Sequence, residues 1–410
     1  MSKRVILCLL ALVVSALSFP LTAEAQYFGK NKVQYKDFDW AILETEHFEV
    51  YYYEKEKEAA FDAARMAERS YARLSHILDH EIKEKVPLVL YASHADFQST
   101  NISPGFIGEG TGGVTEFLKR RVFLPFTGSY AELEHVLTHE LVHAFQVDIL
   151  WGGDARSLLA NPFAFQPPLW VMEGSAEYLA LGGLDPLTEM WLRDGALQGY
   201  LTPIPILNHT YDIRVYRFGQ AIFEYIGRRF GPEKVGELLK RIAASRNVDR
   251  SIRHVTGMSM QKLSEQWLEE VRKTYMPQIA NHEKPANFSK RLTDAARDRT
   301  GFNLSPAVSP TGDKVVFVTN RNLNNGIYLA STLDGRVLKK LVEGGTSGDL
   351  ESLRFFYSSF DWAPNGRLIA FPAKSSGKDD INIFDVDEGK RVARLRFDID
   401  GIRSPSFSPD

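Results

Sequence analysis

Residues 139–143 of this 410-residue chain read His-Glu-Leu-Val-His. They lie within residues 131–145, whose apolar side chains recur at helical spacing and so predict a mostly buried helix. Side chains four residues apart lie one above the other on a helix, so His139 and His143 can share a metal ion. Glu140 would then lie close to the metal without binding it. The stretch therefore predicts a metal site with a free carboxylate beside it.

Such a site can generate a nucleophile for amide hydrolysis at neutral pH. Zinc lowers the pKa of a bound water from about 15.7 to roughly 7, and Glu140 is placed to take the proton. The alternative is a solvated helix face, but two imidazoles and a carboxylate inside a buried helix need partners, which a metal supplies. His135 shares this face and could compete as a ligand. No Glu follows it, so we interpret it as a histidine beside the site or in the core.

A catalytic zinc ion normally has three protein ligands, with the fourth position left to water. Ile149 stands where the metzincin pattern has its third His, and Gln146 where that pattern has Gly, so this pattern is excluded. Residues 168–178 read Pro-Leu-Trp-Val-Met-Glu-Gly-Ser-Ala-Glu-Tyr. They predict a second buried helix that carries two carboxylates one turn apart, Glu173 and Glu177.

The His-Glu-x-x-His and Trp-x-x-Glu-Gly-x-Ala-Glu-Tyr segments together resemble the gluzincins, the thermolysin-like, peptidase MA-like zinc metallopeptidases. The resemblance implies that Glu173 is the third zinc ligand and that Glu177 accepts a hydrogen bond from a ligand histidine. Which histidine this is stays open, as does the alternative that both are charges on a helix surface. Glu173 follows His143 by 30 positions, more than in thermolysin-like enzymes. An inserted loop over residues 151–167 would absorb the excess.

A pair of tyrosines five residues apart, Tyr211 and Tyr216, precedes Gly219 and an aromatic-rich helix. This arrangement is similar to one in zinc aminopeptidases, and the resemblance implies that Tyr216 donates a hydrogen bond to the oxyanion of the tetrahedral intermediate. A phenol with a pKa near 10 remains a donor at pH 7. A purely structural role for Tyr216 as a core aromatic stays open.

Two short strands are predicted just before the histidine helix, within residues 110–116 and 121–124. In gluzincins the edge strand at this location pairs with the substrate backbone. Aminopeptidases of the group carry a Gly-x-Met-Glu-Asn motif there, whose Glu binds the free amino terminus. This chain has Thr115 in that place and Glu116 one position late, and a one-residue slip turns a side chain to the other face of a strand. We therefore expect an endopeptidase rather than an exopeptidase.

The first 25 residues predict a cleavable secretory signal peptide. Lys3 and Arg4 precede a largely apolar run over residues 5–19, and residues 23–25 read Ala-Glu-Ala, which predicts cleavage after Ala25. The run is shorter than the ~20 residues of a membrane span, so no transmembrane segment is expected after cleavage. The expected location is secreted or periplasmic. The only cysteine, Cys8, lies in this segment, so the mature chain would depend on its core rather than on disulfides.

The charge pattern gives no indication of a nucleic-acid partner. The formal net charge is −3, and removal of Lys3, Arg4 and Glu24 with the signal peptide changes it to −4. Lys and Arg are mixed with acidic residues along the predicted helices, as on solvated faces, and no basic stripe is present.

The chain changes character near residue 300. Residues 26–280 predict a mixed sheet followed by helices, the gluzincin-like metallopeptidase domain, and the polar residues 281–302 predict a linker. In residues 303–410, short strands and turns repeat with a period of about 50 residues. This repeat resembles TolB-like and WD40-like β-propeller blades. The fold class is thus α+β, a gluzincin-type domain followed by an all-β propeller-like region. Propellers need about four to eight blades, so we expect a partial propeller from a longer protein.

Two functions from different classes are compatible with these patterns. The first is a secreted or periplasmic zinc metallopeptidase, an endopeptidase acting on a peptide or protein substrate, with Zn²⁺ as its cofactor. The second is a non-catalytic peptidase-like scaffold whose propeller binds a protein partner. A structural zinc site would more often have four ligands and favour Cys, which the mature chain lacks. The first function is favoured because the chain retains the whole predicted set: His139, Glu140, His143, Glu173, Glu177 and Tyr216.

Overall fold

The computed structural model describes residues 32–33, 35–102, 107–117, 119–152, 165–322, 324–345 and 349–410. All that follows concerns the compact unit Gln34–Asp410. The predicted signal peptide, residues 1–25, lies outside the described residues, as do residues 153–164 of the predicted inserted loop.

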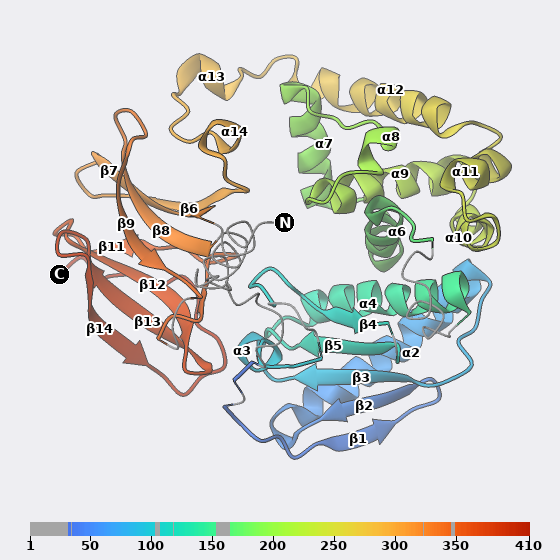
Figure 1. Ribbon diagram of the computed structural model, residues 1–410, viewed down its shortest axis with the longest axis horizontal. Helices are drawn as coiled ribbons and strands as arrows, with labels where there is room; N and C mark the ends of the chain where they lie inside the picture. The colour runs from blue at the N-terminus through green and yellow to red at the C-terminus, as the bar shows by residue number, and fades with distance from the viewer. Residues whose placement is uncertain are drawn as a thin grey trace, which may run out of the picture. The chain divides into compact units, whose positions relative to one another are not determined.

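The unit Gln34–Asp410 begins with a five-stranded mixed sheet (Figure 1). Its strands are β1 (Ala41–Glu44), β2 (Phe48–Tyr52), β3 (Val86–Tyr91), β4 (Val114–Glu116) and β5 (Arg121–Pro125). In the order β1-β2-β3-β5-β4, the three central strands are parallel and each outer strand is antiparallel to its neighbour. Among the described strands, β4 pairs only with β5, with Thr115 opposite Val122, so this short strand lies at the edge of the sheet.

Alternate side chains of the central strands enter two different cores, as the two-residue period of a strand requires. Leu88 and Leu90 join the main core, whereas Val89 and Tyr91 join a smaller cluster on the other face. Two helices pack on the main core: α2 (Lys57–Leu78), which follows the short 3₁₀ helix η1 (Glu54–Glu56), and α4 (Tyr130–Trp151). The one-turn helix α3 (His94–Phe97) adds Phe97 to the smaller cluster on the other face.

Helix α4 carries the His-Glu-x-x-His stretch, and local chemistry fixes both of its ends. The Ser129 side chain accepts a hydrogen bond from the Glu132 backbone N–H at 3.3 Å, which caps the first turn. The helix ends at Gly152, whose φ of 69° lies in the left-handed region that glycine adopts without strain.

Helices dominate the described residues from 165 to 279. They are α6 (Leu169–Leu181), α7 (Pro186–Gln198), α8 (Ile204–Leu207), α9 (Arg214–Phe230), α10 (Glu233–Ser245), α11 (Val248–Thr256) and α12 (Met260–Ile279). The helix expected over residues 168–178 is α6, which packs against both α4 and α9. Two glycines, Gly174 on α6 and Gly219 on α9, allow these two helices to approach backbone to backbone.

Residues 281–302 contain two one-turn helices, α13 (Pro285–Phe288) and α14 (Ala295–Asp298), neither of which has a buried residue. Two antiparallel sheets follow. The first is β6 (Asn303–Val308), β7 (Lys314–Asn322), β8 (Asn324–Ser331) and β9 (Val337–Glu343), in that order; the second contains β10 (Ser352–Leu353), β11 (Asp361–Trp362), β12 (Leu368–Ser375), β13 (Lys378–Asp385) and β14 (Lys390–Arg396). Within the described part of residues 303–410, these sheets do not close into a propeller.

The two sheets reproduce the sequence repeat at the level of individual turns. Gly312 and Gly366 have left-handed φ values of 76° and 68°, and each donates its backbone N–H to the carbonyl three residues earlier. Gly335 and Gly389 form a second matched pair, with φ values of 73° and 72°. The third copy of the repeat is not a strand, but its Phe407 backbone N–H donates to Asp361 at 2.7 Å.

The loop that leads into β4 is hydrogen-bonded to the segment that follows β10. The Glu109 carboxylate accepts the backbone N–H groups of Phe355 and Phe356 at 2.7 and 3.0 Å. Burial dominates over these hydrogen bonds and raises the pKa of Glu109 to about 7. Arg354 pairs with Asp379 at 2.8 Å beside it.

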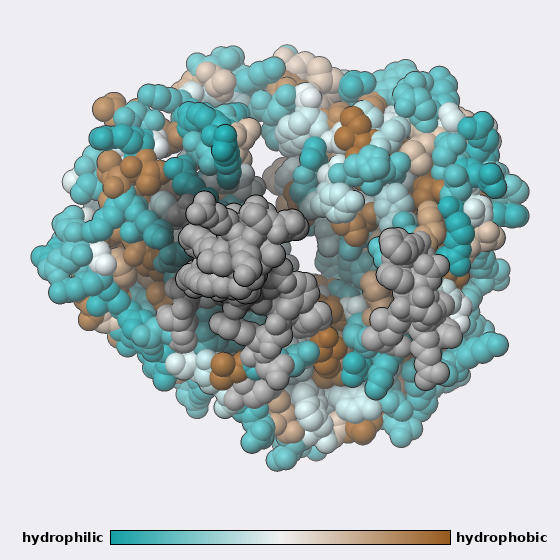
Figure 2. Space-filling model, viewed as in Figure 1, coloured by the Kyte–Doolittle hydropathy of each residue, from teal (hydrophilic) through white to brown (hydrophobic). Residues whose placement is uncertain are grey.

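On the face shown in Figure 2, hydrophilic residues cover most of the described surface, and the hydrophobic residues visible there lie in small groups. Among the residues that the structure describes, no helix combines the length and the apolar character needed to cross a membrane.

Candidate metal centre

Three donor atoms from two helices meet at one point. His139 Nε2 and His143 Nε2, both on α4, are 3.1 Å apart, and Glu173 Oε2 on α6 lies 3.3 Å from the first and 3.2 Å from the second. One helical turn separates the histidines, and α6 brings the carboxylate from 30 positions later in the chain. The structure thus brings together the three residues for which the sequence predicted a shared ion.

These separations match what a tetrahedral zinc site requires. An ion about 2.0–2.1 Å from each of its ligand atoms, at tetrahedral angles, needs ligand atoms about 3.3–3.4 Å apart. The three observed separations, 3.1, 3.2 and 3.3 Å, are close to this value. Two imidazole nitrogens and one carboxylate oxygen are also the donor set of known catalytic zinc sites. The residues present therefore fit a zinc ion.

The pKa values of His143 and Glu173 are shifted in opposite directions by their contact. Burial alone would lower the pKa of His143, but the charge of Glu173 and its hydrogen bond raise this pKa to about 9. Burial alone would raise the pKa of Glu173, but His143 and His139 hold it well below its usual value. The carboxylate is therefore ionised, and either a proton or a metal ion balances its charge.

Gln146, one turn after His143 on α4, contacts the outer nitrogen of that imidazole. His143 Nδ1 lies 2.8 Å from Gln146 Oε1, while Gln146 Nε2 donates to the Met172 carbonyl and to Ser175 Oγ on α6. Sequence reasoning assigned this glutamine no role. The available signal was a polar residue on the same face of an otherwise buried helix.

Glu177 lies beside the site but its hydrogen bond goes to His135. Glu177 Oε2 is 2.9 Å from His135 Nε2, whereas Glu177 Oε1 is 3.9 Å from His139 Nδ1, beyond hydrogen-bonding distance. His135, His139 and Glu177 form a second group of candidate ligands. This group is less compact than the one around Glu173 and can use only the outer nitrogen of His139.

The Glu140 side chain lies near the three donor atoms but is not one of the group. Its Oε2 accepts a hydrogen bond of 2.6 Å from the Thr115 hydroxyl on β4. A Cβ at Gly113 would come within 2.7 Å of the Glu140 side chain, so only glycine leaves room for it. The edge strand therefore holds the carboxylate in place.

A cleft of about 360 Å³ is lined by His139, Glu140, His143 and Glu173. The cleft is lined by β4 and the glycine before it, through Gly113, Val114 and Thr115, and by α6, through Leu169, Met172 and Glu173. Glu116 does not line the cleft, because its carboxylate pairs with Arg121 at 3.1 Å and accepts the Lys119 backbone N–H.

Tyr216 lines the same cleft from α9. Its ring is nearly parallel to the His139 ring, with the two centroids 6.2 Å apart. Burial, and then the negative charges of Glu173 and Glu140, raise the pKa of Tyr216, so its hydroxyl stays protonated. Tyr211, the other member of the predicted pair, is 79% exposed and does not line the cleft.

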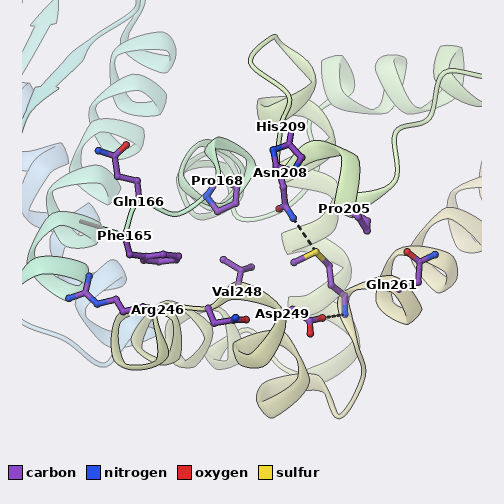
Figure 3. A pocket seen from close by; sticks show the side chains of 12 residues that line it. Phe165, Gln166, Pro168, Pro205, Asn208, His209, Arg246, Val248, Asp249 and Gln261 are labelled. Carbon is purple, nitrogen blue, oxygen red and sulfur yellow. Dashed lines mark hydrogen bonds between the residues drawn. The ribbon is translucent and has the colours of Figure 1, made fainter. Parts of the chain in front are cut away.

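A second cavity, of about 490 Å³, lies next to this cleft, and Gln166 lines both. Asn208 Nδ2 donates a hydrogen bond to the sulfur of Met260, and Asp249 Oδ1 accepts one from the Met260 backbone N–H. Figure 3 shows Asn208 and Asp249 among the residues that line this cavity. The residues that line it include one histidine and one acidic residue, His209 and Asp249, too few for a metal site like that of the cleft.

No protein-family model and no curated protein matches this chain. Solved structures that resemble parts of it include the M1 zinc metallopeptidase from Deinococcus radiodurans, at 16% identity and a TM-score of 0.33, which covers 56% of this chain and 50% of that chain. A two-domain M1 zinc metallopeptidase variant bound to L-tryptophan covers the same shares, at 14% identity and a TM-score of 0.30. TolB from Acinetobacter baumannii, at 23% identity and a TM-score of 0.22, covers 26% of this chain and 24% of that chain.

This chain thus spans half or less of the length of these structures. At such TM-scores the likeness supports no functional inference.

Proposed function

We propose that this chain is a zinc-dependent endopeptidase with its hydrolytic centre in the cleft between β4 and α6. The observation that carries the proposal is the convergence of His139 Nε2, His143 Nε2 and Glu173 Oε2 within 3.1–3.3 Å of one another, with Glu140 free of that group. A site that only stabilised the fold would have no use for an unliganded carboxylate in an open cleft.

His139, His143 and Glu173 would hold the zinc ion, which when bound supplies a Lewis acid that acidifies a water and polarises a peptide carbonyl. Glu140 accepts the proton of the attacking water and delivers it to the leaving amide nitrogen. The Thr115 hydroxyl orients Glu140 for this task. Tyr216, whose hydroxyl stays protonated, donates a hydrogen bond to the developing oxyanion.

The substrate would be an extended peptide or protein segment that pairs with the edge of β4 to which no described strand is bound. Such pairing uses backbone groups of the substrate. It can therefore place an internal peptide bond beside the metal, and it does not require a free terminus of the substrate. The one carboxylate of β4, Glu116, is engaged by Arg121 outside the cleft. No acidic group of the edge strand is thus available to bind a free amino terminus, which favours internal cleavage.

We further propose that the protein is secreted or periplasmic, because residues 1–25 have the pattern of a cleavable signal peptide. The two sheets of the repeat region would bind a protein partner or recruit substrate.

Cleavage of a diverse peptide library by zinc-loaded protein, read by mass spectrometry, tests the endopeptidase. We expect cuts within peptides that disappear when zinc is removed by a chelator and return when zinc is added. Cuts confined to chain ends would contradict the endopeptidase. A zinc-loaded protein that cleaves nothing would favour the peptidase-like scaffold with a binding function.

A further inference from the structure

Gln146 is completely buried, and both polar atoms of its side chain have a hydrogen-bond partner. Its Oε1 lies 2.8 Å from His143 Nδ1, and its Nε2 lies 2.8 Å from both the Met172 carbonyl and Ser175 Oγ. The side chain therefore joins one metal-binding histidine of α4 to the helix that carries Glu173.

The direction of each hydrogen bond follows from the chemistry of its partners. The Ser175 hydroxyl donates to the Val171 carbonyl at 2.7 Å, so its oxygen can accept from Gln146. The Met172 carbonyl can only accept. The Met172 carbonyl thus requires the amide nitrogen of Gln146, the Ser175 oxygen can accept from the same nitrogen, and this leaves the amide oxygen facing His143. An oxygen there requires that Nδ1 of His143 carries the hydrogen.

We propose that Gln146 is a positioning residue that fixes the tautomer of His143. With the hydrogen on Nδ1, the lone pair of Nε2 points to the site shared with His139 and Glu173, and the acceptor on Nδ1 makes Nε2 more basic. The same amide holds α6 in register with α4, which keeps Glu173 at its distance from the histidines. This inference rests on the proposed zinc site.

The test is the zinc affinity of Gln146→Met, a substitution that keeps the size of the side chain but removes both the acceptor and the donors. We expect zinc binding, measured by competition with a chromophoric chelator, to weaken about 10–100-fold. The matched control is Gln220→Met. Gln220 is equally buried and bonds to Thr188 and Gly183, away from the cleft, so this variant should lose stability but bind zinc as the wild type does.

Two further variants separate positioning from packing. Gln146→Glu restores an acceptor to Nδ1 of His143 but loses both donors, so it should bind zinc more tightly than Gln146→Met although its α4–α6 contact is weakened. Ser175→Ala removes only the hydroxyl that orients the amide and should lower zinc affinity by less than Gln146→Met. It keeps the inference testable if Gln146→Met does not fold.

NMR of ¹⁵N-labelled histidine in the zinc-loaded protein reads the tautomer directly. The hydrogen on Nδ1 of His143 should be protected from exchange in the wild type and in Gln220→Met, and lose this protection in Gln146→Met. Unchanged zinc affinity and unchanged protection in Gln146→Met would overturn this inference alone. A wild type that binds no zinc would overturn the proposed function and this inference with it.

Discussion

Gly174 on α6 and Gly219 on α9 lie backbone against backbone. A Cβ on Gly219 would come within 2.7 Å of the Gly174 Cα and 2.8 Å of the Trp170 carbonyl oxygen, distances that side chains do not tolerate. Glu173 precedes the first glycine, and Tyr216 lies one helical turn before the second. The close approach of the two helices is therefore what brings the third metal ligand and the candidate oxyanion donor into one cleft.

Gly219→Ala should force the two helices apart, because both contacted groups are backbone and cannot move aside. We expect a loss of about 1–3 kcal/mol in the free energy of unfolding, together with weaker zinc binding as Glu173 moves away from the histidines. Thermal denaturation and chelator competition measure the two effects. Gly183→Ala is the control, since a Cβ there meets nothing within 4 Å. Equal behaviour of the two variants would contradict the role of the contact.

Glu173→Ala and His135→Ala distinguish the two possible ligand groups. Loss of Glu173 should weaken zinc binding by more than the roughly 10–100-fold typical of residues that only support a ligand. Loss of His135 should leave the zinc content close to that of the wild type, because His139 uses Nε2 rather than Nδ1. Metal content after dialysis against a chelator series reports both. Full occupancy in Glu173→Ala with loss in His135→Ala would assign the metal to the other group.

Tyr216→Phe should lower kcat about 10²–10³-fold if its hydroxyl stabilises the oxyanion. Zinc content and KM should change little, because the ring and its packing against His139 remain. Tyr211→Phe provides a matched control, as Tyr211 is 79% exposed and lies outside the cleft. Hydrolysis of a quenched fluorescent peptide gives both constants. An unchanged kcat in Tyr216→Phe would leave it a structural aromatic.

The helices of the site could be predicted from sequence because their signals are local. The spacing of apolar residues in 131–145 and 168–178 determines which side chains share a helix face, so the metal-site candidates on α4 were evident. The apolar spacing around Tyr211 and Tyr216 does not distinguish them, and only the family resemblance assigned a role to Tyr216; in the structure Tyr211 is exposed and Tyr216 lines the cleft. Which of the two side chains is exposed depends on how α9 packs against the rest of the protein, and a local sequence pattern does not determine this packing.

The contacts that orient the site could not be predicted for the same reason. Gln146 meets its partners on α6, and Thr115 meets Glu140 across the gap between a strand and a helix. The partner of Glu177 was left open by the sequence, and the structure shows a hydrogen bond to His135. Such pairings arise only when segments distant in the chain pack together.

Stability should fall as the pH rises through neutrality, partly because of Glu56. Its carboxyl is buried, and Oε2 has no hydrogen-bond partner among the described residues. Burial, partly offset by the Tyr53 backbone N–H, raises its pKa to about 8. The folded protein thus keeps a proton that the unfolded chain releases near pH 4.5, so the stabilising effect is full at low pH and is lost as pH rises to about 8.

Denaturant unfolding at pH 5 and pH 8 checks this for the wild type and Glu56→Gln. The wild type should lose more stability than the variant over this interval, because glutamine has no proton to release. Equal losses in the two proteins would show that the pKa of Glu56 is not raised.

The rate of peptide hydrolysis by Glu140→Gln at equal zinc occupancy tests the central claim most directly. Glutamine keeps the size of the side chain and can still contact Thr115, but it cannot accept the proton of water. The account predicts unchanged zinc content and a kcat that falls about 10²–10⁴-fold, while Glu134→Gln, an exposed position on the same helix, retains full activity. A zinc-loaded Glu140→Gln protein that hydrolyses peptides at the wild-type rate would contradict it.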